Sequence, residues 1–238
     1  MSSLYKYSLG SATITILGQQ QRIIDDLQLS FDQAKQVGAH PDKITQLIVA
    51  SDNTRAGHKL VCPARANDLM YCDGAVLSEN GSAVIMQTAD CAVLVIYDRV
   101  SGRIACAHAG RPGLSPSKHC ASCTITENAI HALIGHDGDR SQLEALITGN
   151  ICGPCFKHDK NDAFKLIEPF LRYPSTVFAN VEEGALDLFL LIKHNLMFAG
   201  IPESQIRHEG PCTLETPLLS SHRRGDDTRN TFIIVKNE

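Results

Sequence analysis

Short apolar runs alternate with amphipathic segments along the chain, which predicts a mixture of strands and helices. Three consecutive apolar runs are rich in β-branched residues and are bounded by turn residues, as buried strands are. They are SAVIMQ (82–87), AVLVIYD (92–98) and GRIACAHAG (102–110). Further strands are predicted over residues 44–50, 143–149 and 230–237.

Four other segments have the spacing or the end signals of helices. Residues 19–37 place apolar side chains at three- and four-residue intervals, and Gly38 follows as a helix terminator. These side chains are Ile23, Ile24, Leu27, Phe31 and Ala34. Helices are also predicted over residues 125–135, 161–171 and 182–200. Because strands and helices interleave to the end of the chain, the predicted fold class is α+β or mixed α/β.

The chain carries no sign of a division into parts. The 238 residues contain no internal repeat, no low-complexity tract and no long linker rich in Pro, Gly or Ser. We therefore expect a single domain over residues 1–238, built on a mixed β-sheet with flanking helices.

Composition narrows the class of protein. The net charge is −4, and the 22 Lys and Arg residues are scattered, so the basic footprint of a nucleic-acid-binding protein is missing. No apolar run approaches the ~18 residues of a membrane span, and the N-terminal segment lacks a signal-peptide pattern. The nine cysteines are an odd number, which favours reduced thiols over a disulfide framework. We expect a cytoplasmic protein that binds neither nucleic acid nor membrane.

Cys91 and His108 lie at the two ends of a predicted β-hairpin. If DRVSGR (98–103) forms the turn and Asp98 faces Arg103, the two residues are offset by two positions from direct opposition. In a hairpin without a bulge, that offset makes their side chains diagonal neighbours on one face, with Cβ atoms roughly 7 Å apart. A metal ion or a hydrogen bond could then join them. The alternative is that both fill the core, since unpaired Cys is among the most buried residue types.

The order and spacing of several motifs resemble the laccase-domain family, also called the purine nucleoside phosphorylase YfiH-type family. The motifs are TADCAVLVIYD, ACAHAG, GNICGPCF, LDLFLLIKHNLMFAGI and CTLETPLLSSHRRGDDT, and the resemblance covers about residues 19–235. It implies a single-domain YfiH-like fold and a catalytic zinc held by one Cys and two His. Cys91 and His108 match two of the zinc ligands. A zinc with three protein ligands keeps a fourth position for water or substrate.

The third zinc ligand is where the sequence departs from the family. The family has a His in a Q-V-H-G stretch about 36 residues before the Cys, and here the region reads SDNTRAGHKLV (51–61). Aligning the glycines puts Ala56 on the ligand position, and His58 lies two residues later. A shift within a loop would make His58 the ligand; without it, the zinc site is incomplete.

Other residues of the expected site follow from the same resemblance. The family's H-A-G-W-R-G reads HAGRPG here, so Arg111 replaces the aromatic residue and Pro112 replaces the arginine, and the family's N-terminal T-R-x-G-G-V-S segment has no match before residue 19. Arg223 and Arg224 are kept and are expected to bind phosphate, with a solvated loop as the alternative. Asp90 and Asp73 are expected beside the substrate or a ligand histidine, or else cap the backbone of turns.

Two further metal or redox hypotheses are disfavoured. CGPC (152–155) is typical of a thioredoxin motif, but the next predicted helix begins too late; pairing with CASC (120–123) would make a zinc ribbon of unusual spacing. A turn of the family, G-P-x-x-G-P-C, explains residues 149–155 more simply. None of the ten His forms an H-x-H pair, which argues against multicopper oxidation.

Three functions remain open. The first is a zinc-dependent purine nucleoside phosphorylase acting on adenosine or inosine with phosphate, with adenosine deamination as a second activity. The second is a hydrolase or amidase for cell-wall precursors, in which Cys91 attacks and His108 is the base. The third is a non-catalytic remnant of the family. The first two imply a small-molecule substrate, and the oligomeric state is left open.

Overall fold

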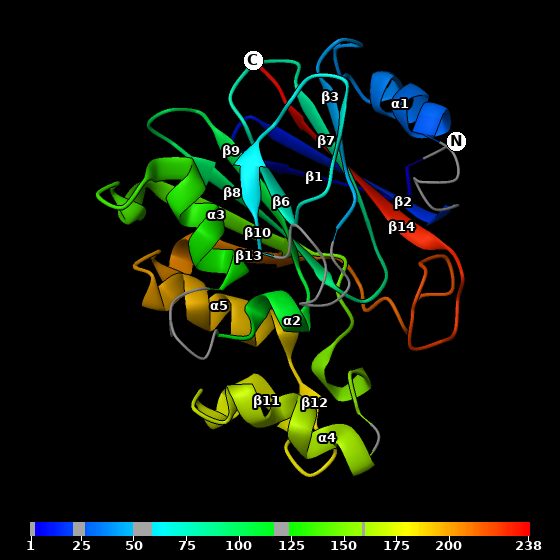
Figure 1. The fold of residues 1–238 in the computed structure, drawn as a ribbon, viewed down its shortest axis with the longest axis vertical. Helices are drawn as coiled ribbons and strands as arrows, with labels where there is room; N and C mark the ends of the chain where they lie inside the picture. The colour runs from blue at the N-terminus through cyan, green and yellow to red at the C-terminus, as the bar shows by residue number, and fades with distance from the viewer. Residues whose placement is uncertain (1–2, 21–26, 50–58, 117–123, 159) are drawn as a thin grey trace.

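Two six-stranded mixed β-sheets form the centre of the part of the chain that the structure describes, a computed structural model (Figure 1). The described residues are 3–20, 27–49, 59–116, 124–158 and 160–238. In spatial order, the first sheet consists of β1 (Tyr5–Leu9), β2 (Ala12–Gln20), β14 (Arg229–Lys236), β7 (Ala83–Thr88), β3 (Ile44–Leu47) and β5 (Asp68–Met70). The second consists of β13 (Ile206–Glu209), β10 (Leu143–Thr148), β8 (Ala92–Asp98), β9 (Ile104–Ala109), β6 (Gly74–Leu77) and β4 (Val61–Pro63). A small ribbon pairs β11 (Phe178–Asn180) with β12 (Ala185–Leu186).

The described helices are α1 (Leu27–Gln36), α2 (Arg111–Leu114), α3 (Ile125–Ile134), α4 (Lys160–Ile167) and α5 (Leu188–Phe198). Helices α1, α3 and α5 lie against the sheets, whereas α4 lies away from them, near the β11–β12 ribbon (Figure 1). Buried residues of α3 and α5 pack on the second sheet, and Ala34 of α1 packs on the first. The predicted α+β class with mixed sheet and flanking helices is confirmed, although the strands divide between two large sheets. The single domain stays a prediction.

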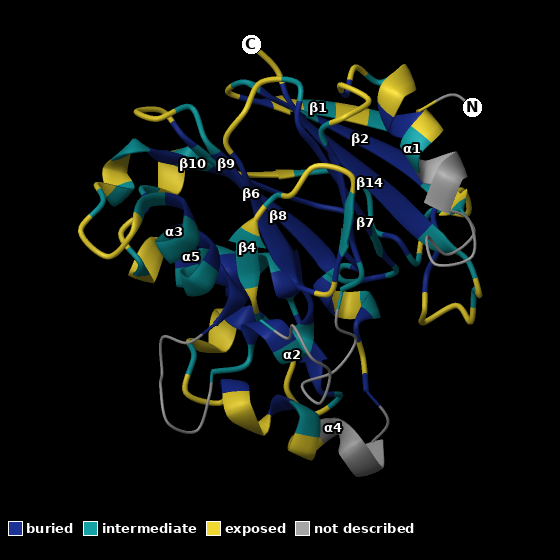
Figure 2. Cartoon of the chain, turned by 45° about the horizontal axis from the view of Figure 1, so that its top comes forward, coloured by how far each residue is buried: buried dark blue, intermediate teal, exposed yellow. Residues whose placement is uncertain are grey.

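The continuous apolar runs are explained by burial of the strands on both faces. In β8, Val93 and Val95 face the cluster between the two sheets, whereas Leu94 and Ile96 face the helices. Alternate residues of a strand point to opposite faces, so a strand buried on both faces must be apolar at every position. Figure 2 shows the central strands buried and the exposed residues gathered on the connecting segments and outer helix faces.

The predicted hairpin of β8 and β9 is confirmed with its register. Val93 pairs with His108, and the Asp98 N–H donates to the Arg103 carbonyl at 3.0 Å. The Asp98 carboxylate accepts a hydrogen bond from the Val100 N–H at 3.0 Å, which closes the turn locally. Cys91, directly before β8, is therefore the diagonal neighbour of His108 in sequence register.

Two predicted helices begin later than expected. Residues 19 and 20 belong to β2, which pairs with both β1 and β14, and α1 is described only from Leu27, while residues 21–26 lie outside the described part. Residues 185–186 form β12, and the Asp187 carboxylate accepts from the Leu190 N–H at 3.0 Å, so α5 starts at Leu188 instead of residue 182. Strand pairing over long sequence distances overrides the helical spacing in the first case.

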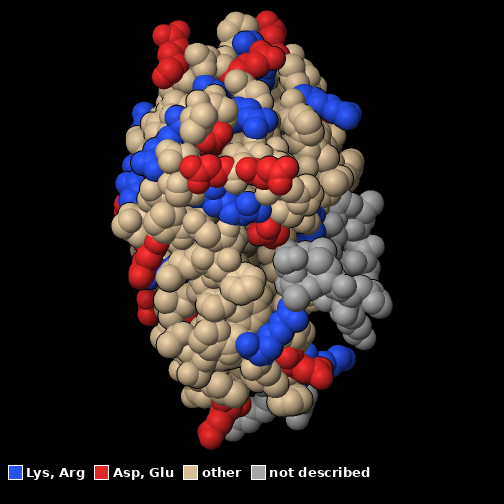
Figure 3. Space-filling view, turned by 90° about the vertical axis from the view of Figure 1, so that its left-hand side faces the viewer, with Lys and Arg blue, Asp and Glu red and all other residues tan. Residues whose placement is uncertain are grey.

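The charged residues on the face shown in Figure 3 are mixed in sign, and no continuous basic stripe crosses that face. None of the described helices is long and apolar enough to cross a membrane. That the chain binds no nucleic acid stays a prediction.

The two-sided burial of β8 predicts the effect of a valine truncation. Val95 is fully buried and Val100, in the adjoining turn, is 77% exposed. Val95→Ala should lower the free energy of unfolding in urea by about 2 kcal/mol, since it removes buried methyl groups and leaves a cavity. The matched control Val100→Ala should change it by less than about 0.5 kcal/mol. Equal losses in the two variants would contradict this account of the core.

Candidate active site

Cys91 and His108 meet beside Gly110. A Cβ atom built on Gly110 would lie 2.8 Å from Cys91 Sγ and 3.1 Å from His108 Nε2, so both atoms border one point in space. Any side chain at residue 110 would fill that point. The glycine therefore keeps open the space that the sulfur and the imidazole nitrogen share.

Asp73 holds the imidazole of His108 from the opposite edge. Its Oδ1 lies 3.2 Å from His108 Nδ1, and its Oδ2 accepts the Lys59 N–H at 2.7 Å. The backbone adds a bond from the His108 N–H to the Asp73 carbonyl at 2.7 Å. A carboxylate is an acceptor, so Nδ1 carries a proton and Nε2 is the nitrogen that faces Cys91.

The Cys91–His108 pair has strong electrostatic coupling. Burial lowers the pKa of His108, but the Cys91 thiolate and the Asp73 carboxylate raise it more, to about 10. Without a metal, the raised pKa favours the protonated imidazolium form of His108 at neutral pH. A metal ion would have to displace that proton, because only neutral imidazole is a ligand. The same two side chains suit either a metal site or a thiolate nucleophile.

Two arginines bring positive charge to this pair. Arg111 opens α2 directly after Gly110, and Arg223 stacks its guanidinium over Phe156, with 5.0 Å from Cζ to the ring centroid. Burial lowers the pKa of Arg111, the charge of Arg223 lowers it further, and the Cys91 thiolate raises it. Neither arginine forms an ion pair with any residue in the described ranges. Two neighbouring guanidiniums without a carboxylate ion pair favour an anionic ligand.

His158 borders the same group of charges. Burial lowers its pKa, and the charges of Arg223 and Arg111 lower it further. Its Nδ1 lies 2.7 Å from the Gly184 carbonyl and therefore carries the proton. Its Nε2 is buried and has no hydrogen-bond partner among the described residues. His158 thus presents an unused acceptor near the arginines.

Asp90 holds backbone segments around the site. Asp90 has a left-handed backbone with a φ of +75° in the turn before Cys91. Its Oδ1 accepts from the Thr213 hydroxyl at 2.6 Å, and its Oδ2 accepts the Arg223 N–H at 2.8 Å. Its carbonyl accepts the Ile151 N–H at 3.0 Å. Of the two carboxylates predicted at the site, Asp73 contacts a histidine and Asp90 joins loops.

The other predicted residues take different places. The Arg224 guanidinium bonds to Asp226 and to the Leu214 carbonyl at 3.0 Å, so its donors are used within its own loop. His58 lies outside the described residues, and the chain continues at Lys59, whose N–H binds Asp73. The structure therefore brings together Cys91, His108, Asp73 and Arg223.

Sequence reasoning gave no role to Arg111, Phe156 and His158. Arg111 carried a signal, since it replaces an aromatic residue directly after the H-A-G motif. Phe156 and His158 follow CGPC in a segment without periodicity, so no sequence pattern assigned them.

Comparison with known proteins identifies the family of the chain. The family model described as multi-copper polyphenol oxidoreductase laccase matches residues 12–235. The chain is similar to a purine nucleoside phosphorylase of Streptomyces coelicolor, with 30% identity over 66% of this chain and 60% of that protein. A purine nucleoside phosphorylase of Campylobacter jejuni is 27% identical over 75% of this chain and 72% of that protein. An adenosine deaminase from an unknown prokaryotic organism is 26% identical over 67% and 60%. The chain thus spans about three fifths of the first and third of these relatives.

Solved structures show the same fold. Neisseria meningitidis protein NMB0706 superposes with a TM-score of 0.74 at 18% identity over the whole of both chains. The hypothetical protein YfiH of Bacillus licheniformis gives a TM-score of 0.68 at 19% identity over 94% of this chain and 92% of that one. The relatives named above carry enzyme names, in agreement with the expectation that this chain is an enzyme. Because the family model matches nearly the whole chain, this protein belongs to the family described as multi-copper polyphenol oxidoreductase laccase.

Proposed function

We propose that the protein is a purine nucleoside phosphorylase whose reaction takes place at the Cys91–His108 pair. The observation that carries this proposal is the position of Arg111 and Arg223, two guanidiniums without a carboxylate ion pair among the described residues, beside Cys91. Phosphate is the anion that a phosphorylase must hold, and planar guanidiniums match its oxygens. The names of the Streptomyces and Campylobacter relatives support the choice of purine nucleosides.

Zinc fits the residues of this pair. Thiolate sulfur and imidazole nitrogen are its usual ligands, and Cys91 Sγ and His108 Nε2 border the space that Gly110 leaves open. Asp73 on the far nitrogen of His108 is the partner that metal-binding histidines normally have. His58 remains the sequence-predicted third ligand. When bound, zinc supplies a Lewis acid that polarises a reacting oxygen.

Side chains of the protein would then have separate roles in binding phosphate and nucleoside. Arg111 and Arg223 bind phosphate and hold it against the sugar, where it replaces the purine at the anomeric carbon. With zinc on Nε2, His108 would carry its single proton on Nδ1, where the Asp73 carboxylate accepts it. His158 Nε2, a buried acceptor, suits a hydroxyl of phosphate or ribose. The deaminase name of one relative makes adenosine deamination a second activity to test at this site.

A thiolate nucleophile is the second candidate function. Cys91 Sγ and His108 Nε2 border one point in space, which is the arrangement of the nucleophile and its base in Cys–His hydrolases that attack carbonyl groups. The hydrolase or amidase hypothesis needs no phosphate and no metal, and a non-catalytic protein would show no turnover at all. A test of whether turnover requires phosphate therefore distinguishes both the hydrolase and the non-catalytic protein from the phosphorylase.

Product analysis tests the proposed activity. Adenosine or inosine with phosphate should give free purine base, and Cys91→Ala should lower the rate at least 100-fold because the thiolate is lost from the reaction centre. Cys62→Ala, a free half-buried thiol on β4, is the matched control and should keep wild-type turnover. Base release that needs no phosphate, or that persists in Cys91→Ala, would contradict the proposal. An inactive wild type would favour the other two hypotheses.

The arginines predict a specific change in phosphate binding. Arg111→Gln and Arg223→Gln should each raise the KM for phosphate about 10-fold or more, since a charge-assisted bond contributes roughly 1.5–3 kcal/mol. The KM for nucleoside should change much less. Arg65→Gln, with its side chain 72% exposed, is the control. Steady-state kinetics with phosphate varied measures this, and a change in the KM for nucleoside alone would contradict a phosphate-binding role of the two arginines.

Replacing Asp73 should lower the affinity for zinc although both proposed ligands, Cys91 and His108, remain. Asp73→Asn should weaken zinc binding about 10- to 100-fold, because the partner that orients His108 is removed. Competition with a chromogenic chelator measures this, and Asp68→Asn, at the half-buried start of β5, is the control. Unchanged zinc affinity in Asp73→Asn would argue against His108 as a ligand.

A further inference from the structure

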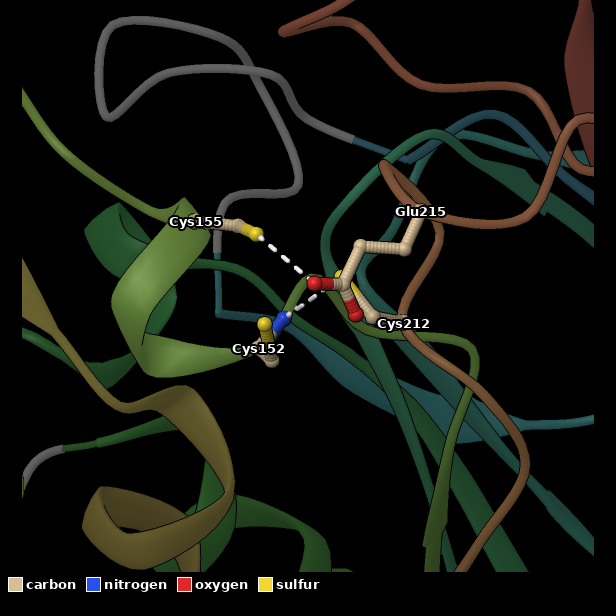
Figure 4. A group of neighbouring side chains, drawn as sticks. All are labelled: Cys152, Cys155, Cys212 and Glu215. Carbon is tan, nitrogen blue, oxygen red and sulfur yellow. Dashed lines mark hydrogen bonds between the residues drawn. The ribbon is translucent and has the colours of Figure 1, made fainter.

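Three cysteines and a glutamate gather at a second place in the fold. Cys152, Cys155, Cys212 and Glu215 each offer one ligand atom, and these atoms all lie within 4.8 Å of one another (Figure 4). Cys152 caps a 3₁₀ turn, Gly153–Cys155, that ends on Cys155, and the other two residues lie about 60 positions later. Tertiary structure alone brings the two segments together.

Two hydrogen bonds within the cluster involve cysteine sulfur atoms. The Cys152 N–H donates to Cys212 Sγ at 3.2 Å, a bond that stabilises negative charge on sulfur. Cys155 Sγ donates to Glu215 Oε1 at 3.7 Å, so the carboxylate turns inward to the thiols, as Figure 4 shows. The three cysteines are half-buried and none is in a disulfide, whereas Glu215 is exposed. A small cation therefore has an entry from the side of Glu215.

We propose that these four residues bind a second zinc ion, whose role is structural. Three thiolates and one carboxylate fill all four positions of a tetrahedral zinc, which leaves none for substrate. With Zn–S bonds near 2.3 Å, two tetrahedral ligands lie about 3.8 Å apart, so ligand atoms within 4.8 Å of one another need only a small inward shift. The C-x-x-C spacing at a tight turn is also typical of structural zinc.

The local fold disfavours a redox use of the same cysteines. A thioredoxin-type C-x-x-C opens a helix, whereas here CGPC itself forms a single 3₁₀ turn and α4 starts only at Lys160. Cys212 and Glu215, absent from such a motif, supply the other half of the cluster. A ribbon pairing with residues 120–123 concerns a segment outside the described residues.

The second zinc would link two segments that contact Arg223 and Asp90 at the candidate active site. Phe156, next to Cys155, lies under the Arg223 guanidinium. Thr213, next to Cys212, donates to Asp90 in the turn before Cys91. A metal that joins Cys155 to Cys212 would therefore fix the positions of Phe156 and Asp90 relative to each other, without touching substrate.

Zinc counting in the full chain tests this site separately from the proposed active site. The Cys91→Ala variant, purified under reducing conditions and loaded with zinc, should retain one tightly bound zinc per chain by elemental mass spectrometry. Cys91→Ala/Cys212→Ser should retain none, and Cys91→Ala/Cys62→Ser, the matched control, should still retain one. If Cys91→Ala binds no zinc while Cys152, Cys155 and Cys212 are reduced, the second site is overturned, whatever the fate of the nucleoside activity.

Glu215→Gln is a second test variant that we expect to fold, because the Glu215 side chain is exposed. In the Cys91→Ala background it should weaken zinc binding at least 10-fold. Cobalt(II) should give the thiolate-to-metal absorption of a three-cysteine site in Cys91→Ala and lose it in Cys91→Ala/Cys212→Ser. Chelator should lower the Tm of Cys91→Ala and leave that of Cys91→Ala/Cys212→Ser unchanged. A chelator-insensitive Tm in Cys91→Ala, or zinc affinity unaffected by Glu215→Gln, would contradict the site.

Discussion

The pairing of β8 with β9 is the constraint on which the candidate active site depends. It sets Val93 opposite His108 and so brings the ring beside Cys91, which precedes β8. Both strands are buried on both faces, in the middle of a six-stranded sheet. A slip of one residue would turn His108 to the other face and exchange the side chains that pack in the two core clusters, so core packing fixes the register. Cys91 and His108 are thus held by two buried central strands of the sheet.

Two buried aspartates extend that rigidity to the surrounding loops. Asp73, from the segment before β6, fixes the imidazole of His108 and the backbone N–H of Lys59. Asp90 joins its own turn to Thr213 and to the Arg223 backbone. Each carboxylate accepts from at least one backbone N–H, which compensates its removal from water. Their bonds place the thiolate, the imidazole and one guanidinium with little freedom.

Arg111 shows how the chain differs chemically within a shared fold. It replaces an aromatic residue of the family motif and adds a positive charge near the Cys91 thiolate and Arg223. The solved relatives, at 18 and 19% identity, keep the fold because it depends on apolar positions in the strands. Residues at the loop ends are free to vary, and they decide which anion or substrate the site accepts.

The sequence determined what local periodicity and turn chemistry control, while the tertiary structure decided what joins distant segments. The hairpin with its register and the helix Ile125–Ile134 ended by Gly135 were predictable, because their signals lie within about ten residues. The start of the helix predicted at residue 19 was wrong, because β2 pairs with β14, more than 200 residues away. Likewise, no sequence pattern joined Cys155 to Cys212 or Arg111 to Arg223, because loop residues have no period and only packing sets their positions.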